Sequence, residues 1–220
     1  MGFEESLRLS IALGLTVFLV LLRFDSERIM RSDYFRYRSP WLGPASYYGL
    51  VVAFTIGIML ILPGGRAQLF LAGGDPETML PVMLLFSAVA VIFAAGLALR
   101  RYGAILPLPA TLLPSRALSA AANAVADELQ FRGIVLGMLL FANVPVAIAL
   151  AVQALLFGAA QRRLWRDRDW FFLPAAVLLG YGAGLAVVTT GSVVSAIVGH
   201  FAVSMALFAF AGERLRQRPI

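Results

Sequence analysis

Four ionisable residues lie deep inside long apolar segments, where charged side chains are seldom found. Asp127, Glu128 and Arg132 fall in one such segment, and His200 falls in another. A charge at the centre of a bilayer costs on the order of 3 kcal/mol on insertion scales, so such residues usually mark a functional site. Glu128 and Arg132 are four residues apart and can pair on one helix for purely structural reasons. That pairing leaves Asp127 and His200 unexplained, so the pattern favours a chemical site.

The composition indicates that lipid surrounds most of the chain. Of the 220 residues, 60% are hydrophobic and 14% are charged, whereas soluble domains average about 45–50% and 25%. Without cysteine the chain has no disulfide, thiolate nucleophile or iron–sulfur cluster, and with one histidine it has no bis-histidine haem site. Without lysine it has neither a retinal Schiff base nor a P-loop lysine. The net charge of +6 comes from an excess of arginine. In a membrane protein such an excess is explained by the orientation of the chain more readily than by nucleic-acid binding.

The sequence predicts an all-α, polytopic membrane protein with about seven transmembrane helices. Each apolar run approaches the roughly 20 residues that cross about 30 Å of hydrocarbon. The predicted spans are residues 7–22, 41–62, 79–99, 116–141, 145–161, 171–188 and 192–211. Arginines are concentrated in alternate loops, and the other side receives only Arg8 and Arg66. This asymmetry predicts that the N-terminus is outside and the C-terminus is cytoplasmic.

The loop 23–40 is the most highly charged connection, with five arginines beside acidic and aromatic residues. It can form a surface helix on anionic lipid. A solvated basic loop that fixes the orientation of the chain explains it equally well. No repeat or low-complexity linker divides the chain, so we expect a single membrane domain over residues 1–220.

Depth along the helices indicates whether the polar residues can meet. At about 1.5 Å per residue, Asp127 lies about 17 Å from the cytoplasmic end of its span. His200 lies about 12 Å from the outer end of an antiparallel span, with Ser204 one turn deeper on the same face. Phe157 and Gln161 are one turn apart near the cytoplasmic end of the fifth span. A polar pocket between the fourth, fifth and seventh spans is therefore expected.

Three stretches in this region resemble the motifs of one family. The run ADELQFRG at 126–133 resembles the EExxxR motif of the CAAX-protease and bacteriocin-processing family of intramembrane proteases. The run ALLFGAAQ at 154–161 is similar to its FxxxH motif, and 190–204 is similar to its final HxxxN motif. The resemblance covers about residues 116–210. It divides the predicted domain into three N-terminal spans with an interfacial segment, 1–115, and a four-helix core, 116–211.

The resemblance implies a role for each matching position. Four residues match the motifs: Glu128, Arg132, Phe157 and His200. Three depart from them: Asp127 for the first glutamate, Gln161 for the histidine of FxxxH, and Ser204 for the final asparagine. In the family, the first glutamate and the FxxxH histidine activate a water. The histidine and the asparagine of the final HxxxN motif stabilise the oxyanion. Aspartate can act as a base from one methylene further back, and glutamine can orient a water without taking its proton.

The mechanism predicted from these residues is hydrolysis of a peptide bond by water. Asp127, Gln161 and His200 hold the water, and Arg132 pairs with Glu128. His200 also polarises the scissile carbonyl, and the hydroxyl of Ser204 assists it. Phe157 and Phe131 are expected to contact the substrate. No cofactor is expected, because one histidine and two carboxylates barely supply the ligands of a zinc site. A serine-protease mechanism is also not favoured, because no nucleophile-elbow motif surrounds a serine.

The resemblance implies a membrane-embedded or lipidated protein as substrate, such as a leader peptide or a C-terminal membrane anchor in bacteria. The lipid bilayer is the other expected partner, and no nucleic acid is expected. The lysine-free composition, rich in alanine, leucine and arginine, favours a bacterial inner membrane. Because three chemical positions are substituted, the alternative is a catalytically inactive relative that acts as a membrane scaffold or binding protein. A transporter fits less well, since the polar residues gather at one site and no inverted repeat is visible.

Overall fold

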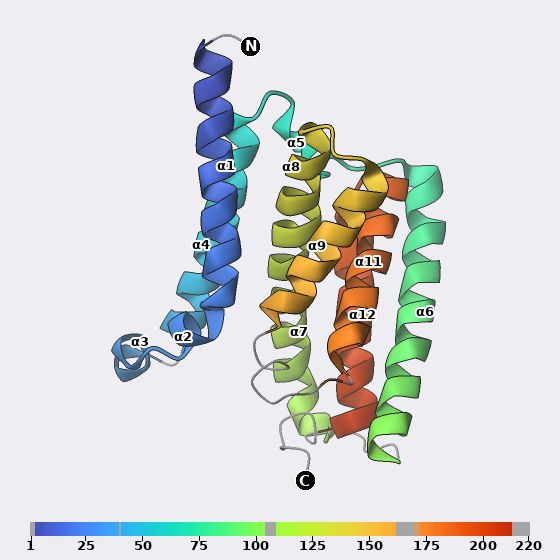
Figure 1. Ribbon diagram of the computed structural model, residues 1–220. Helices are drawn as coiled ribbons and strands as arrows, with labels where there is room; N and C mark the ends of the chain where they lie inside the picture. The colour runs from blue at the N-terminus through green and yellow to red at the C-terminus, as the bar shows by residue number, and fades with distance from the viewer. Residues whose placement is uncertain (1–2, 40, 104–108, 162–169, 171, 213–220) are drawn as a thin grey trace.

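A computed structural model describes residues 3–39, 41–103, 109–161, 170 and 172–212, and this part of the chain is helical without any strand (Figure 1). The first half contains α1 (Phe3–Phe24), α2 (Ser26–Met30), α3 (Asp33–Arg38), α4 (Leu42–Ile61), α5 (Gly65–Gln68) and α6 (Pro76–Tyr102). The second half contains η1 (Ala110–Leu112), α7 (Leu113–Glu128), η2 (Leu129–Val135), α8 (Leu136–Phe141), α9 (Val146–Ala160), α11 (Phe172–Thr190) and α12 (Val194–Ala211). The predicted all-α class is confirmed for these residues.

In the described part of the chain, five helices are long and apolar enough to cross a membrane: α1, α4, α6, α11 and α12. The fifth predicted span corresponds to α9, which is shorter. The fourth corresponds to α7, η2 and α8, which follow one another without a break. The helices that correspond to the predicted spans alternate in direction (Figure 1), and five of them have the length and composition of a span, so the total of about seven spans stays a prediction.

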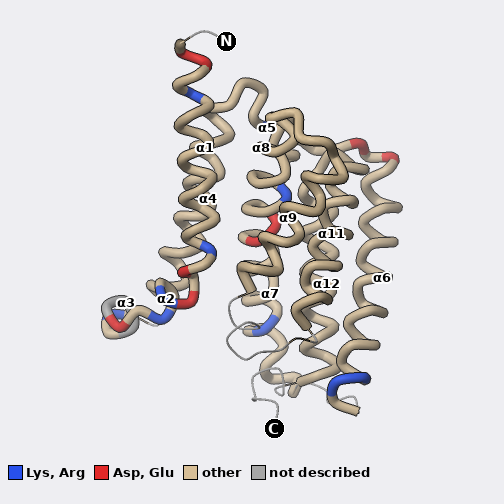
Figure 2. The backbone as a smooth tube through the Cα atoms, viewed as in Figure 1, with Lys and Arg blue, Asp and Glu red and all other residues tan. Residues whose placement is uncertain are grey.

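The arginines that can be located follow the predicted asymmetry. Basic segments lie at the same end of the bundle, in α2 and α3, at the end of α6 and at the start of α7 (Figure 2). The arginines between the fifth and sixth predicted spans, in residues 162–169, lie outside the described residues, as do residues 104–108 between the third and fourth predicted spans. The orientation of the termini stays a prediction.

The ends of α6 illustrate how local sequence sets a helix boundary. The Asp75 side chain caps the helix by accepting a hydrogen bond from the Glu77 N–H at 3.2 Å, and Pro76 occupies the first turn, where its missing N–H costs nothing. Gly103 ends the helix with φ of 69°, a left-handed conformation that glycine adopts without strain.

The segment α7–η2–α8 is the central element of the fold. Every residue from 130 to 138 is buried, whereas α1, α4 and α6 expose large apolar side chains, including Leu60 and Ile92, as lipid-facing helices do. The helix pair α1 and α4 lies on one side of this segment, and α9, α11 and α12 lie on the other (Figure 1). Within it, η2 has the wider π-helical hydrogen-bonding pattern, which often occurs at functional sites.

Gly137 permits the short helix α5 to lie directly against the central segment. A methyl group at this position would lie 2.6 Å from the carbonyl oxygen of Gln68 and 3.2 Å from Cα of Leu69. Both atoms belong to the backbone, so neither can move aside cheaply. We therefore expect Gly137→Ala to destabilise the protein by about 1–3 kcal/mol, as overpacking does.

Thermal unfolding in detergent, followed by circular dichroism, measures this effect. The matched control is Gly96→Ala in α6, where nothing lies within 4 Å of the added methyl group. Alanine there is expected to be neutral or slightly stabilising, because it is the better helix former. Equal unfolding midpoints for the two variants would contradict this packing account.

Candidate functional site

The Glu128–Arg132 pair lies at the junction of α7 and η2. The Arg132 guanidinium donates from Nη1 to Oε1 of Glu128 at 3.1 Å, and the two side chains are 0% and 1% exposed. A buried ion pair of this kind costs desolvation of both groups and persists only when further contacts satisfy them. The i,i+4 pairing predicted from the sequence is thus present.

His200 reaches the same carboxylate from α12. Its Nδ1 lies 2.7 Å from Oε1 of Glu128, the oxygen that also accepts from Arg132. Its side chain is 11% exposed, the most accessible of the three. Nε2 makes no hydrogen bond with the described residues. Glu128 therefore orients the imidazole through one ring nitrogen and leaves the other available for chemistry.

Phe157 of α9 forms an aromatic wall behind this cluster. Its ring meets the His200 ring edge-on at 5.9 Å and the Phe131 ring at 5.4 Å, and the guanidinium carbon of Arg132 lies 4.4 Å from its centroid. The last contact is a cation–π interaction, which is strongest where water is excluded. Gly180 of α11 leaves space beside it, since a methyl group there would lie 3.2 Å from Phe157 and 3.3 Å from Arg132.

Asp127 belongs to a separate cluster. Its two carboxylate oxygens accept from Arg23 at the end of α1, with Nε to Oδ1 at 2.6 Å and Nη2 to Oδ2 at 3.1 Å. Arg23 also donates from Nη1 to the hydroxyl of Ser26 at 3.0 Å. Consecutive helical residues point about 100° apart, so Asp127 faces α1 while Glu128 faces α12. From the sequence, Arg23 is expected to begin a basic loop that fixes the orientation of the chain, and no motif indicates this pairing.

Gln161 and Ser204, the other two substituted positions, lie four residues after Phe157 and His200, respectively. Gln161 follows the last residue of α9, and Ser204 lies one turn after His200 on α12, and both are half-buried. Neither side chain hydrogen-bonds to Asp127, Glu128 or His200 within the described part of the chain. The predicted set of Asp127, Gln161 and His200 around one water is therefore not joined by direct contacts.

The cluster of Glu128, Arg132, Phe157 and His200 retains hydrogen-bonding capacity. Oε2 of Glu128 and Nε and Nη2 of Arg132 are buried and have no partner among the described residues. A carboxylate, an imidazole and a guanidinium in one apolar enclosure can transfer a proton and stabilise negative charge. No group of three or more His, Cys, Asp or Glu side chains in the described residues is placed to hold a metal ion.

A family comparison identifies the segment that carries this cluster. Residues 109–206 match the model of the family described as Type II CAAX prenyl endopeptidase Rce1-like. The match contains all three motifs and confirms the resemblance, whereas α1 to α6 lie outside it. Comparison with curated proteins and with solved structures gives no significant match.

Removal of Arg132 alone should be more harmful than removal of the whole pair. Arg132→Met leaves the Glu128 charge buried with the imidazole as its remaining partner, so we expect a loss of about 3–5 kcal/mol in stability. The double variant Glu128→Gln/Arg132→Met leaves no unpaired charge and should recover part of this loss. Thermal unfolding in detergent measures both variants.

The chain contains a matched control for this experiment. Arg8 and Glu4 form a pair with the same i,i+4 spacing on α1, at 2.6 Å, with side chains that are 51% and 76% exposed. Because exposed pairs contribute about 0–1 kcal/mol, Arg8→Met should change stability little. A double variant that is less stable than Arg132→Met would contradict the account of a buried charge pair.

Proposed function

We propose that the protein is an intramembrane endopeptidase that hydrolyses a peptide bond in a membrane-associated protein. The observation that carries the proposal is the 2.7 Å contact between His200 and the buried Glu128 carboxylate, inside the segment that matches the CAAX endopeptidase family. The family implies a membrane-associated protein substrate. A leader peptide or a C-terminal membrane anchor fits a site that is enclosed by apolar helices.

In the mechanism that this geometry favours, His200 is the general base. Glu128 accepts from Nδ1–H and so fixes the tautomer in which Nε2 carries the lone pair. Nε2 takes a proton from water as the water oxygen bonds to the carbonyl carbon. The imidazolium then gives this proton to the departing nitrogen, and the C–N bond breaks. Arg132 balances the charge of Glu128 throughout, and Phe157 excludes water from the far side of the ring.

Asp127 has a different role in this proposal from the one predicted by motif position. Both of its oxygens are engaged by Arg23, so it is poorly placed to accept a proton from water. Ser204 keeps its predicted role, since it lies one helical turn from His200 and has no hydrogen bond with the described residues. Gln161 keeps the role of orienting the water, through its amide.

We also propose that α7–η2–α8 and α9 complete seven spans, with the N-terminus outside and the C-terminus in the cytoplasm of a bacterial inner membrane. The continuous segment Leu113–Phe141 is about 43 Å long at the α-helical rise, which exceeds the hydrocarbon thickness. The helix α9 is about 22 Å long and packs against α11 within the bundle.

Substitution of either Glu128 or His200, the two residues of the 2.7 Å contact, tests the proposed function. We expect Glu128→Gln and His200→Ala to reduce cleavage of a tagged membrane-anchored reporter by about 10²–10⁴-fold, because general-base catalysis contributes this much. Gel electrophoresis of the reporter in proteoliposomes measures cleavage. Glu77→Gln, at an exposed acid on α6, serves as the control. Unchanged cleavage in both site variants would reject the roles given to Glu128 and His200, whereas a wild-type protein that cleaves no reporter would favour the catalytically inactive scaffold.

Ser204 gives a separate test of the oxyanion role. Loss of one oxyanion donor lowers kcat by about 10²–10³-fold in a well-studied protease, so Ser204→Ala should lower kcat and leave KM nearly unchanged. Ser204→Asn replaces the hydroxyl by an amide donor and should retain more activity than Ser204→Ala. Equal activities for the two variants would show that this side chain donates nothing in the transition state.

A further inference from the structure

A second buried polar cluster lies on another face of the central segment, about 100° around the helix from the Glu128 side chain that meets His200. Arg23 and Asp127 are its charged members, with side chains that are 14% and 6% exposed. The proposed mechanism uses neither of them. A bidentate guanidinium–carboxylate pair fixes both the distance and the relative orientation of the two helices that carry it.

We infer that Arg23 is a positioning residue, which docks the N-terminal helix pair onto the acid-bearing helix and thereby sets the placement of Glu128 and Phe157. This inference rests on the proposed function, because it concerns the same site. Arg23 lies outside the family-matching segment 109–206, so a helix beyond that segment supplies a part of the enzyme.

The first support is that the ion pair acts on the residue next to Glu128. Asp127 and Glu128 are consecutive at the end of α7, where the backbone changes to the π-helical η2. Turns of this kind are rare and often occur at functional sites. Arg23 holds both oxygens of Asp127, and this contact fixes the direction in which Glu128 points.

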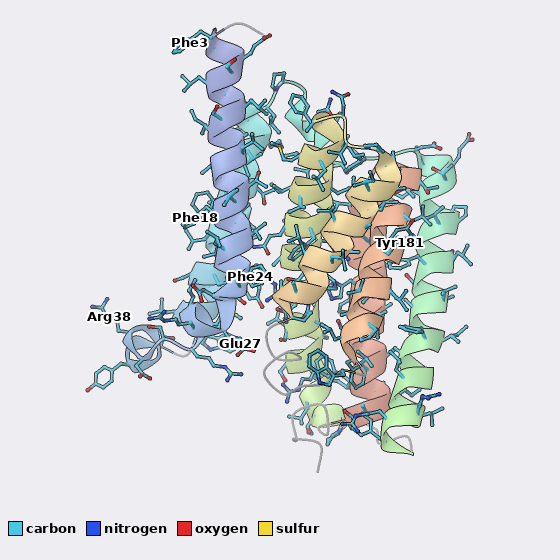
Figure 3. The ribbon with its side chains drawn as sticks, viewed as in Figure 1. Phe3, Phe18, Phe24, Glu27, Arg38 and Tyr181 are labelled. Atoms are coloured by element: carbon cyan, nitrogen blue, oxygen red, sulfur yellow. The ribbon has the colours of Figure 1, made fainter. Side chains whose placement is uncertain are left out.

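The second support is that α1 also packs on the wall of the site. Val20 and Phe24 of α1 pack against the buried cluster that contains Phe131 and Phe157. Figure 3 labels Phe24 at the end of α1, in the same turn as Arg23. Since Phe157 contacts His200 edge-on, a displacement of α1 would be transmitted to the imidazole through one ring.

The third support is that a second polar contact joins the same elements. The Tyr48 hydroxyl of α4 donates to Oδ1 of Asn123 on α7 at 2.8 Å, one helical turn before Asp127. The Ser26 hydroxyl holds the other side of the Arg23 guanidinium. The helix pair therefore meets the acid-bearing helix through matched polar groups, and their geometry specifies one docking position.

A double-mutant experiment tests the inference on the full-length protein. The variants are Arg23→Gln, Asp127→Asn, the double variant Arg23→Gln/Asp127→Asn, and the conservative variant Arg23→Lys. Each is measured for the thermal unfolding midpoint in detergent, and for kcat and KM on the anchored reporter in proteoliposomes. The control is Arg8→Gln, which removes the exposed pair with Glu4 on the same helix.

We expect each single charge removal to lower the unfolding midpoint by several degrees and kcat at least tenfold, with KM changed less than threefold. The double variant should exceed both singles in midpoint and in kcat, because it leaves no unpaired buried charge. Arg23→Lys should fall between wild type and Arg23→Gln, since it keeps the charge and loses the bidentate geometry. Arg8→Gln should match wild type.

Two results would overturn the inference. If the midpoints recover in the double variant while kcat stays as low as in Asp127→Asn, then Asp127 reacts with water itself and Arg23 does not act by positioning. If the effects of the two single variants simply add, the ion pair does not couple the helices. A wild-type protein that cleaves no reporter rejects the proposed function instead, and the midpoints would still show whether Arg23 and Asp127 are coupled.

Discussion

The carboxylate of Glu128 is the group on which the arrangement of the bundle depends, because an ionised carboxylate in an apolar interior must be matched by charge and hydrogen bonds. Its own helix provides Arg132, α12 provides His200, and Phe157 of α9 packs against both partners. The surrounding helices present mainly apolar surface to lipid. Rotating such a helix about its axis changes its free energy in lipid little, because each face is similarly apolar. The few polar contacts at Glu128 therefore distinguish the observed packing of these three helices from its alternatives.

The backbone around this carboxylate is adapted to large polar side chains. An arginine near a membrane surface extends toward the headgroups, whereas Arg132 is fully buried and must be accommodated between helices. Gly180 provides this space by bringing the backbone of α11 close to the guanidinium and to Phe157. On the same helix, the carbonyl of Gly180 accepts a hydrogen bond from Gln153 of α9 at 2.9 Å, so the close approach of α9 and α11 is also held by a polar contact.

The sequence predicted the helices and the Glu128–Arg132 pair because both follow from local rules, namely apolar run length and i,i+4 spacing. Depth along antiparallel spans also placed His200 at the right level to meet the acidic pair, and the structure brings it to Glu128. The direction of Asp127 was not predicted, although helical geometry already separates consecutive side chains by about 100°. Its partner, Arg23, lies 104 residues away and matches no motif, so only the tertiary fold reveals it. The π-helical η2 likewise has no local sequence signature that we could have used.

Charge balance connects the two polar clusters to the proposed chemistry. Arg132 neutralises Glu128 and Arg23 neutralises Asp127, so each acidic residue enters the apolar interior as part of a neutral pair. The imidazole of His200 can then gain a proton at the moment when the substrate carbonyl oxygen gains negative charge, and the two new charges offset one another. In the proposed mechanism the N-terminal helix pair, which carries Arg23, therefore acts on the electrostatics of the site and contributes no reacting group.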